Sequence, residues 1–263
     1  MTSRYLLRFA ALGYLAALLV VPVGIVARRA FQDGLDAFWG AITTPEALHA
    51  LWLTILIALI AVPANTVFGI FCALAIVRRR FPGHGLVNSI VDLPLALSPV
   101  VVGLALVLVY GRNGWWGGWL NDQGIDVIYA LPGMVLATIF VSLPFVVREV
   151  VPVLREIGDE QEEAASTLGA GPWHTFWRVT LPAIRWGVAY GVVLTTARAL
   201  GEFGAVSVVS GRIAGRTETM TLHVEERFQS FDLTGAYASS VVLALLAVGT
   251  LLAMTLLRKE EHS

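Results

Sequence analysis

Long apolar runs separated by short polar segments dominate the pattern of this chain. Six of these runs come close to or exceed the about 20 residues that a helix needs to cross a bilayer. Regular runs of this kind, with polar residues mainly between them, predict an all-α membrane protein with six transmembrane helices. We expect residues 1–263 to form a single transmembrane domain. The six predicted spans are Phe9–Ala27, Leu48–Val77, Leu93–Tyr110, Leu131–Val147, Trp186–Val209 and Gly235–Leu257.

Prolines interrupt several of the predicted spans. The third opens with Asp92-Leu93-Pro94 and continues through Ser98-Pro99, and the fourth contains Pro132 and Pro144. A proline inside a span frees a backbone carbonyl, which a neighbouring helix or a polar cavity must then satisfy. This pattern suits a bundle around a pathway, and it suits simple kinks packed inside protein equally well.

The composition supports a membrane protein. Hydrophobic residues make up 57% of the chain and charged residues only 14%, with a mean hydropathy of +0.74. A soluble domain carries about 25% charged residues. The net charge of −1 says little about partners, and we expect a lipid environment and no nucleic acid.

Two residue counts exclude whole classes of site. The single cysteine, Cys72, rules out an intrachain disulfide and a cysteine-based zinc site. The single lysine, Lys259, is followed by Glu260, whereas a P-loop requires lysine before serine or threonine. If transport is driven by ATP, the ATPase must therefore be another chain, and we expect no cofactor in this one.

The basic residues predict an orientation. With the N-terminus inside, 11 lysines and arginines fall on the inner side and 6 on the outer side, with Arg198 left at membrane depth. Cytoplasmic loops carry such an excess of positive charge. Both termini are then expected in the cytoplasm of a multi-pass protein, together with the polar segment between the fourth and fifth spans.

That polar segment, Glu162–Pro182, predicts a short helix–turn–helix. Glu162–Leu168 favours a helix with acids in its first turn. Gly169 and Gly171 are expected to end it, and Pro172 suits the first position of the next helix. We expect Pro182 to stop that second helix.

The same segment resembles the EAA loop of ABC-importer membrane subunits. Its pattern is Glu163-Ala164-Ala165, three residues, Gly169, nine residues, an aliphatic residue, one residue and Leu-Pro. The resemblance implies a MetI-like, type I importer permease whose loop, about residues 148–186, is a coupling helix that docks on a cytoplasmic ATPase. The alternative is an ordinary amphipathic loop on the bilayer surface. The residues expected to couple to the ATPase are Glu163, Ala164, Ala165 and Gly169, with Trp173 and Phe176 as apolar anchors.

Two charges remain within the fifth predicted span. Arg198 and Glu202 are four residues apart and would share one helix face. A charge at membrane depth costs about 2.5–3.5 kcal/mol on insertion scales, so such residues face a bundle interior or a wet cavity. The two form either a structural pair or part of the path of an anion.

Residues around this pair sharpen the resemblance. Ala199–Gly211 is similar to the fifth-helix signature of oxyanion permeases, and Asp92–Gly103 also fits that group. Together with Leu143–Val150, they look most like the CysW-type permeases of sulfate/thiosulfate importers, with molybdate/tungstate permeases as the alternative. The resemblance implies a bacterial inner-membrane protein. Its implied partners are a sister T-type permease, two copies of an ATPase that uses ATP and Mg²⁺, and an external sulfate-binding protein. Our candidates for the path of the anion are Arg198, Glu202 and Ser98.

The largest outer segment, Gly211–Thr234, has no motif. Its pattern from Thr217 to Phe228 predicts a short amphipathic helix, in either a binding-protein contact or a solvated connector. An intramembrane enzyme is the rival class of function. The five histidines are scattered, without a HExxH pair, and Ser207 and Ser210 have no nearby base, so we expect a permease and not an enzyme.

Overall fold

The structure is a computed structural model that describes residues 2–78 and 83–259, with the side chains of 2–7, 84 and 253–259 outside the description. Arg79 and Arg80, which entered the orientation count, also lie outside it. The described part contains helices and their connections and no strand, so the predicted all-α class is confirmed. The helices are α1 Thr2–Leu15, η1 Ala16–Val20 (a π turn), α2 Val21–Ala30, α3 Leu35–Ile42, α4 Pro45–Arg78, α5 His84–Ala96, α6 Pro99–Tyr110, α7 Gly117–Asp122, α8 Leu131–Ile157, α9 Glu160–Thr167, α10 Pro172–Thr175, η2 Phe176–Thr180 (a π turn), α11 Leu181–Leu200, α12 Gly204–Val209, α13 Met220–Gln229 and α14 Leu233–Lys259.

Four helical stretches in the described residues are long and apolar enough to cross a membrane by themselves. A fifth span follows if α5 and α6 are taken together, although their axes differ by 111°. The helix α11 does not reach the apolar character of these spans. The four stretches are Arg8–Ala30, Pro45–Arg78, Leu131–Ile157 and Leu233–Leu252.

The prediction of one continuous third helix over Leu93–Tyr110 is wrong. The helix ends at Ala96 and a new one begins at Pro99. The ring of Pro99 clashes with the backbone of Ser98 and so disfavours the helical region for that residue. Ser98 accordingly has φ −63° and ψ 135°.

The prediction of one continuous fifth helix over Trp186–Val209 is also wrong. α11 ends at Leu200, and α12 begins at Gly204. Gly201 is a weak helix former, and the Glu202 side chain offers the backbone another partner. Its Oε1 accepts a hydrogen bond from the N–H of Ala205 at 2.8 Å, which starts the second helix.

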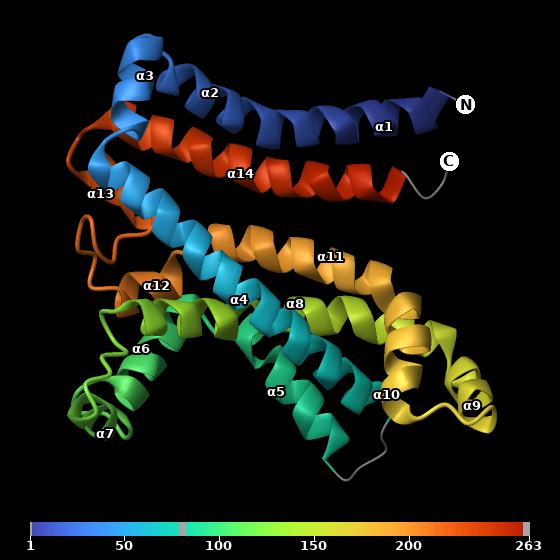
Figure 1. Cartoon of the computed structure of the whole chain (residues 1–263). Coiled ribbons are helices and arrows are strands. Elements are labelled where there is room, and N and C mark those ends of the chain that lie inside the picture. The colour runs from blue at the N-terminus through green and yellow to red at the C-terminus, as the bar shows by residue number, and fades with distance from the viewer. Residues whose placement is uncertain (1, 79–82, 260–263) are drawn as a thin grey trace.

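The centre of the bundle is formed by α4, α8 and α11 (Figure 1). Glycines bring these helices close together: a Cβ on Gly69 or Gly191 would lie 2.7 or 2.8 Å from atoms of Val146 on α8. A buried amide also joins α4 to α8, because Asn65 donates to Ser142 Oγ at 2.8 Å. Alongside this centre, α2 packs against α14.

The short helices lie at two opposite ends of the bundle (Figure 1). α9 and α10 lie at the end where α1 begins and α14 finishes. α3, α7 and α13 lie at the other end. The helix expected within Thr217–Phe228 is present as α13, shifted by a few residues.

Candidate functional site

The first part of the candidate site is the α9 loop, residues 158–180, at one end of the bundle. α9 covers Glu160–Thr167 and carries three acids in its first turn, where the helix dipole favours negative charge. Gly169 follows with φ +87°, a left-handed conformation that glycine adopts without steric cost. The predicted helix and its glycine stop are therefore both present.

The prediction that Pro182 stops the second helix is wrong. The chain stays helical from Pro172 to Leu200 and passes through the π turn η2 immediately before Pro182. A proline within a helix lacks an N–H and clashes with the carbonyl four residues earlier. In η2 the N–H of Leu181 bonds to the carbonyl of Phe176, five residues back, which widens the turn at that point. The helix changes direction here rather than ending (Figure 1).

Most of the predicted coupling residues lie on the surface of this loop. Glu163, Ala164 and Gly169 are exposed, and Ala165 is half-buried. Trp173 is 70% exposed, whereas Phe176 is half-buried and packs against the core cluster that contains Ile184. The two predicted anchors therefore differ: Phe176 belongs to the bundle, and Trp173 is available to a partner.

An aromatic cluster gives the loop an exposed apolar surface. The rings of Trp173 and Phe176 are stacked with centroids 6.2 Å apart, and Trp177 meets Trp173 edge-on at 5.6 Å. Trp177 was not among the predicted site residues. Its place four residues after Trp173 on one helix face was the signal that could have found it.

A polar network ties the loop to the bundle, and sequence reasoning missed it. Arg78, at the end of α4, donates from Nε to Glu162 Oε2 at 3.0 Å. Its other nitrogens donate to the carbonyls of Leu154 and Gly158, which belong to the end of α8. Thr180 completes the network by donating to Glu162 Oε1 at 2.8 Å. One carboxylate thus fixes α9 to the end of α4 and to η2.

A groove of about 530 Å³ runs along the inner side of this network. Phe71 and Ala75 of α4 form one wall, and Ser166, Pro172 and Phe176 of the loop form the other.

The second part of the candidate site is the meeting of the two helix breaks. A Cβ on Gly204, at the start of α12, would lie 2.8 Å from Pro99 Cβ at the start of α6. A Cβ on Gly103 would lie 2.8 Å from the carbonyl oxygen of Ala205. Glycines at these points let the two interrupted helices touch. Ser98 is exposed beside this contact, and its side chain makes no capping hydrogen bond.

Arg198 and Glu202 form an ion pair at the same place. Arg198 Nη1 lies 2.6 Å from Glu202 Oε2, although the angle is not that of a hydrogen bond. The Glu202 side chain is 2% exposed and that of Arg198 is 28% exposed. Arg198 therefore presents the accessible charge, and Glu202 holds both Arg198 and the start of α12.

These features define a class of protein: a multi-pass membrane subunit of a transporter. Residues 65–259 match the family described as "binding-protein-dependent transport system inner membrane component". The chain belongs to this family of transport permeases. Its class as a permease, and not an enzyme, follows from that membership.

Relatives of similar length share about half of their residues with this chain. The sulfate transport system permease protein CysW of Synechocystis sp. is 52% identical, with 97% of this chain and 93% of the relative covered. CysW of Escherichia coli (strain K12) is 49% identical over 92% of this chain and 84% of the relative. The CysT permease of the same strain is 41% identical over 88% and 84%.

A solved structure confirms the fold. One chain of a bacterial ABC transporter involved in the import of the polysaccharide alginate superposes with a TM-score of 0.81. It covers 97% of this chain and 94% of its own length at 18% identity. The MetI-like permease fold expected from the sequence is thereby confirmed.

Proposed function

We propose that this chain is a membrane-spanning permease subunit of an ATP-driven importer that carries sulfate and thiosulfate into the cytoplasm. The observation that carries this proposal is identity of about 50%, over nearly the whole chain, to permeases named for sulfate transport. The region aligned with the Synechocystis relative covers 97% of this chain.

The accessible guanidinium at the meeting of the helix breaks supports passage of an anion. Discontinuous membrane helices line the substrate sites of many transporters. The Arg198 guanidinium can attract a dianion that passes through the membrane. When no anion is present, the buried Glu202 carboxylate neutralises the guanidinium, so that neither charge is unpaired. In this proposal Arg198 attracts the anion, Glu202 positions Arg198, and Ser98 offers a hydroxyl to the path.

The α9 loop supports coupling to an ATPase. Its exposed residues Glu163, Ala164 and Gly169, together with Trp173, would form the docking surface. ATP and Mg²⁺ would be bound by two copies of a separate ATPase subunit. Both termini and the α9 loop would then lie in the cytoplasm. The remaining partners would be a T-type permease and an external sulfate-binding protein.

Uptake of labelled sulfate tests the substrate. Cells that lack this subunit and cells in which it is restored would be compared, with excess molybdate or thiosulfate as competitor. We expect uptake to return with the subunit, to survive molybdate and to fall with thiosulfate. Abolition by low molybdate would favour the molybdate/tungstate permease instead, and no sulfate uptake at all would overturn the proposed substrate.

A further inference from the structure

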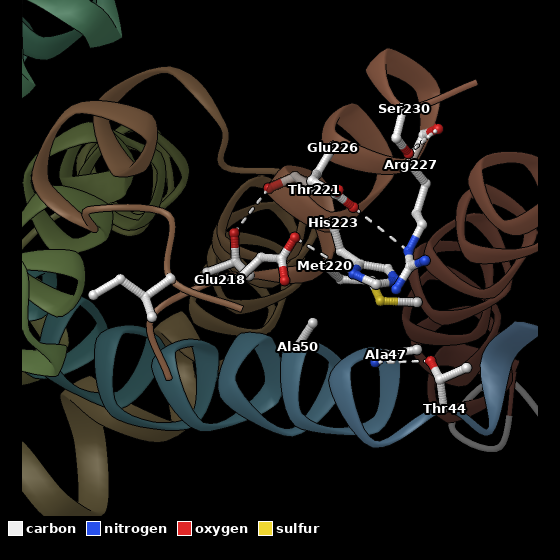
Figure 2. Close-up of polar contacts among 12 residues, drawn as sticks. Thr44, Ala47, Ala50, Glu218, Met220, Thr221, His223, Glu226, Arg227 and Ser230 are labelled. Carbon is white, nitrogen blue, oxygen red and sulfur yellow. Dashed lines mark hydrogen bonds and ion pairs between the residues drawn. The ribbon is translucent and has the colours of Figure 1, made fainter. Parts of the chain in front are cut away.

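Three potential metal ligands meet in the α13 loop, residues 210–232, at the end of the bundle opposite the α9 loop. Glu218 precedes α13, and His223 and Glu226 lie on that helix. One ligand atom from each lies within 4.8 Å of the other two. Figure 2 shows the Glu218 carboxylate and the His223 ring pointing toward one another above Ala47 and Ala50 of α4.

The cluster is buried more deeply than its polarity would favour. His223 is 1% exposed and Glu218 is 3% exposed, whereas Glu226 is exposed. Two of the buried atoms, His223 Nδ1 and Glu218 Oε2, have no hydrogen-bond partner among the described residues. A buried polar group without a partner lowers the stability of the folded protein. A bound cation would satisfy both atoms and neutralise the carboxylate.

The distance between the two buried ligands suits a shared ion. His223 Nδ1 lies 3.4 Å from Glu218 Oε1. In a tetrahedral zinc site with metal–ligand distances near 2.0–2.1 Å, neighbouring ligand atoms are roughly 3.3 Å apart. A small rotation of Glu226 would bring the third ligand from the exposed side and leave the fourth position to water.

The ligand types select a class of ion. An imidazole with carboxylates suits Zn²⁺ and similar first-row divalent ions, whereas Ca²⁺ and Mg²⁺ prefer oxygen alone. The guanidinium of Arg227 lies 3.5 Å from Glu226 Oε2 and 3.6 Å from Asp232 Oδ2. Asp232 can retain Arg227 when Glu226 turns toward the ion.

We propose that Glu218, His223 and Glu226 form a binding site for a divalent transition-metal ion, with Zn²⁺ as the best fit, in the α13 loop. The site fastens this loop over α4. The neighbouring residue Met220 already donates its N–H to Thr54 of α4 at 2.8 Å. Thr221, between the ligands, donates to the carbonyl of Glu202 at 2.8 Å. An ion in this site therefore stabilises the segment that contacts the Arg198–Glu202 pair.

Binding of Zn²⁺ to the assembled transporter tests this site directly and does not depend on the transported anion. The complex would be purified without a histidine tag, stripped with a chelator and titrated with Zn²⁺ alone. We expect one high-affinity ion per copy of this chain. With Co²⁺ instead, we expect the visible absorption bands of a tetrahedral site with nitrogen and oxygen ligands.

Matched variants locate the site. Glu226→Gln changes an exposed ligand and should weaken Zn²⁺ binding at least tenfold, while Glu225→Gln, its neighbour outside the cluster, should change it less than twofold. His223→Gln should abolish binding, and His49→Gln at the same end should leave it intact. Absence of Zn²⁺ binding to the wild-type complex would overturn the proposal, as would equal binding by Glu226→Gln and Glu225→Gln.

Discussion

The loops at the two ends of the bundle are similar in length and differ in how much of each is buried. In the α9 loop only Thr180 is buried, and Leu168 and Trp173 are 88% and 70% exposed. The α13 loop instead buries Glu218, Met220 and His223 within the bundle. Both loops expose large apolar side chains, because Phe228 and Phe231 of the α13 loop are 57% and 88% exposed, so the difference lies in how the loops are attached. The α9 loop, which is fixed mainly through one carboxylate, is suited to contact another protein. A loop that buries its charges is built to stay in place.

This difference separates two kinds of defect. Changes in the α9 loop should alter transport while the subunit stays folded, because few of its side chains contribute to the core. Changes in the α13 loop and in the ion pair beneath it should lower stability as well. The following variants test this separation, from the largest expected effect to the smallest.

Gly169→Pro should abolish uptake at normal membrane levels of the subunit. Gly169 has φ +87°, whereas proline is fixed near −65°, so the turn after α9 cannot form. Gly171→Pro is the matched control, because Gly171 has φ −72°, close to the value that proline fixes. Uptake by Gly169→Pro equal to that of Gly171→Pro would contradict the role of this turn.

Arg198→Ala should destabilise the complex by about 3 kcal/mol and reduce uptake, because it leaves the buried Glu202 carboxylate without its ion-pair partner. The loss is expected at the low end for buried pairs, since Glu202 keeps the N–H of Ala205. Thermal unfolding of the purified complex measures it. The double variant Arg198→Met with Glu202→Gln should recover stability but not uptake. Full uptake by that double variant would show that the charge is not part of the path.

Glu162→Gln should uncouple ATP hydrolysis from uptake, since it weakens the charged hydrogen bonds from Arg78 that fix α9 to the bundle. Glu160→Gln, an exposed change in the same helix, provides the control. Substrate-stimulated hydrolysis and uptake would be measured in the same vesicles. A ratio of uptake to hydrolysis that matches the control would show that Glu162 does not fix the loop.

Thr221→Val should lower the stability of the complex by about 1 kcal/mol, because it removes the hydrogen bond to the Glu202 carbonyl at almost constant volume. The same change at Thr175, whose hydroxyl bonds only within the exposed α9 loop, should have little effect on stability. Equal melting temperatures for the two variants would show that the α13 loop contributes no more to stability than the α9 loop.

The sequence predicted best what depends on local chemistry. The helix of α9, the glycine turn and the start of α10 at Pro172 follow from acids, glycine and proline at fixed spacing. The apolar runs likewise located the helices that became α4, α8 and α14. The resemblance carried by Glu163-Ala164-Ala165 and Gly169 led to the correct family.

Features that no spacing or propensity rule anticipates could not be predicted. Arg78 lies 84 residues from Glu162, so no spacing rule connects them. At the break after Leu200, the Glu202 carboxylate accepts a hydrogen bond from the N–H of Ala205, three residues later. This hydrogen bond competes with the continuous helix that the apolar run favoured. Pro182 was expected to end a helix because the local rule has no means of anticipating the π turn before it.

The pairing of α2 with α14 has a consequence for synthesis. The first long apolar helix, Arg8–Ala30, has no buried side chain in its most apolar window, and its main neighbour begins at Leu233. About 200 residues separate the two, which at roughly 5–20 residues per second corresponds to some tens of seconds of translation. During that time the first helix must remain in the bilayer with lipid as its neighbour. Its mean hydropathy of 2.4 is the highest of the four spans, which favours a stable position in lipid during that time.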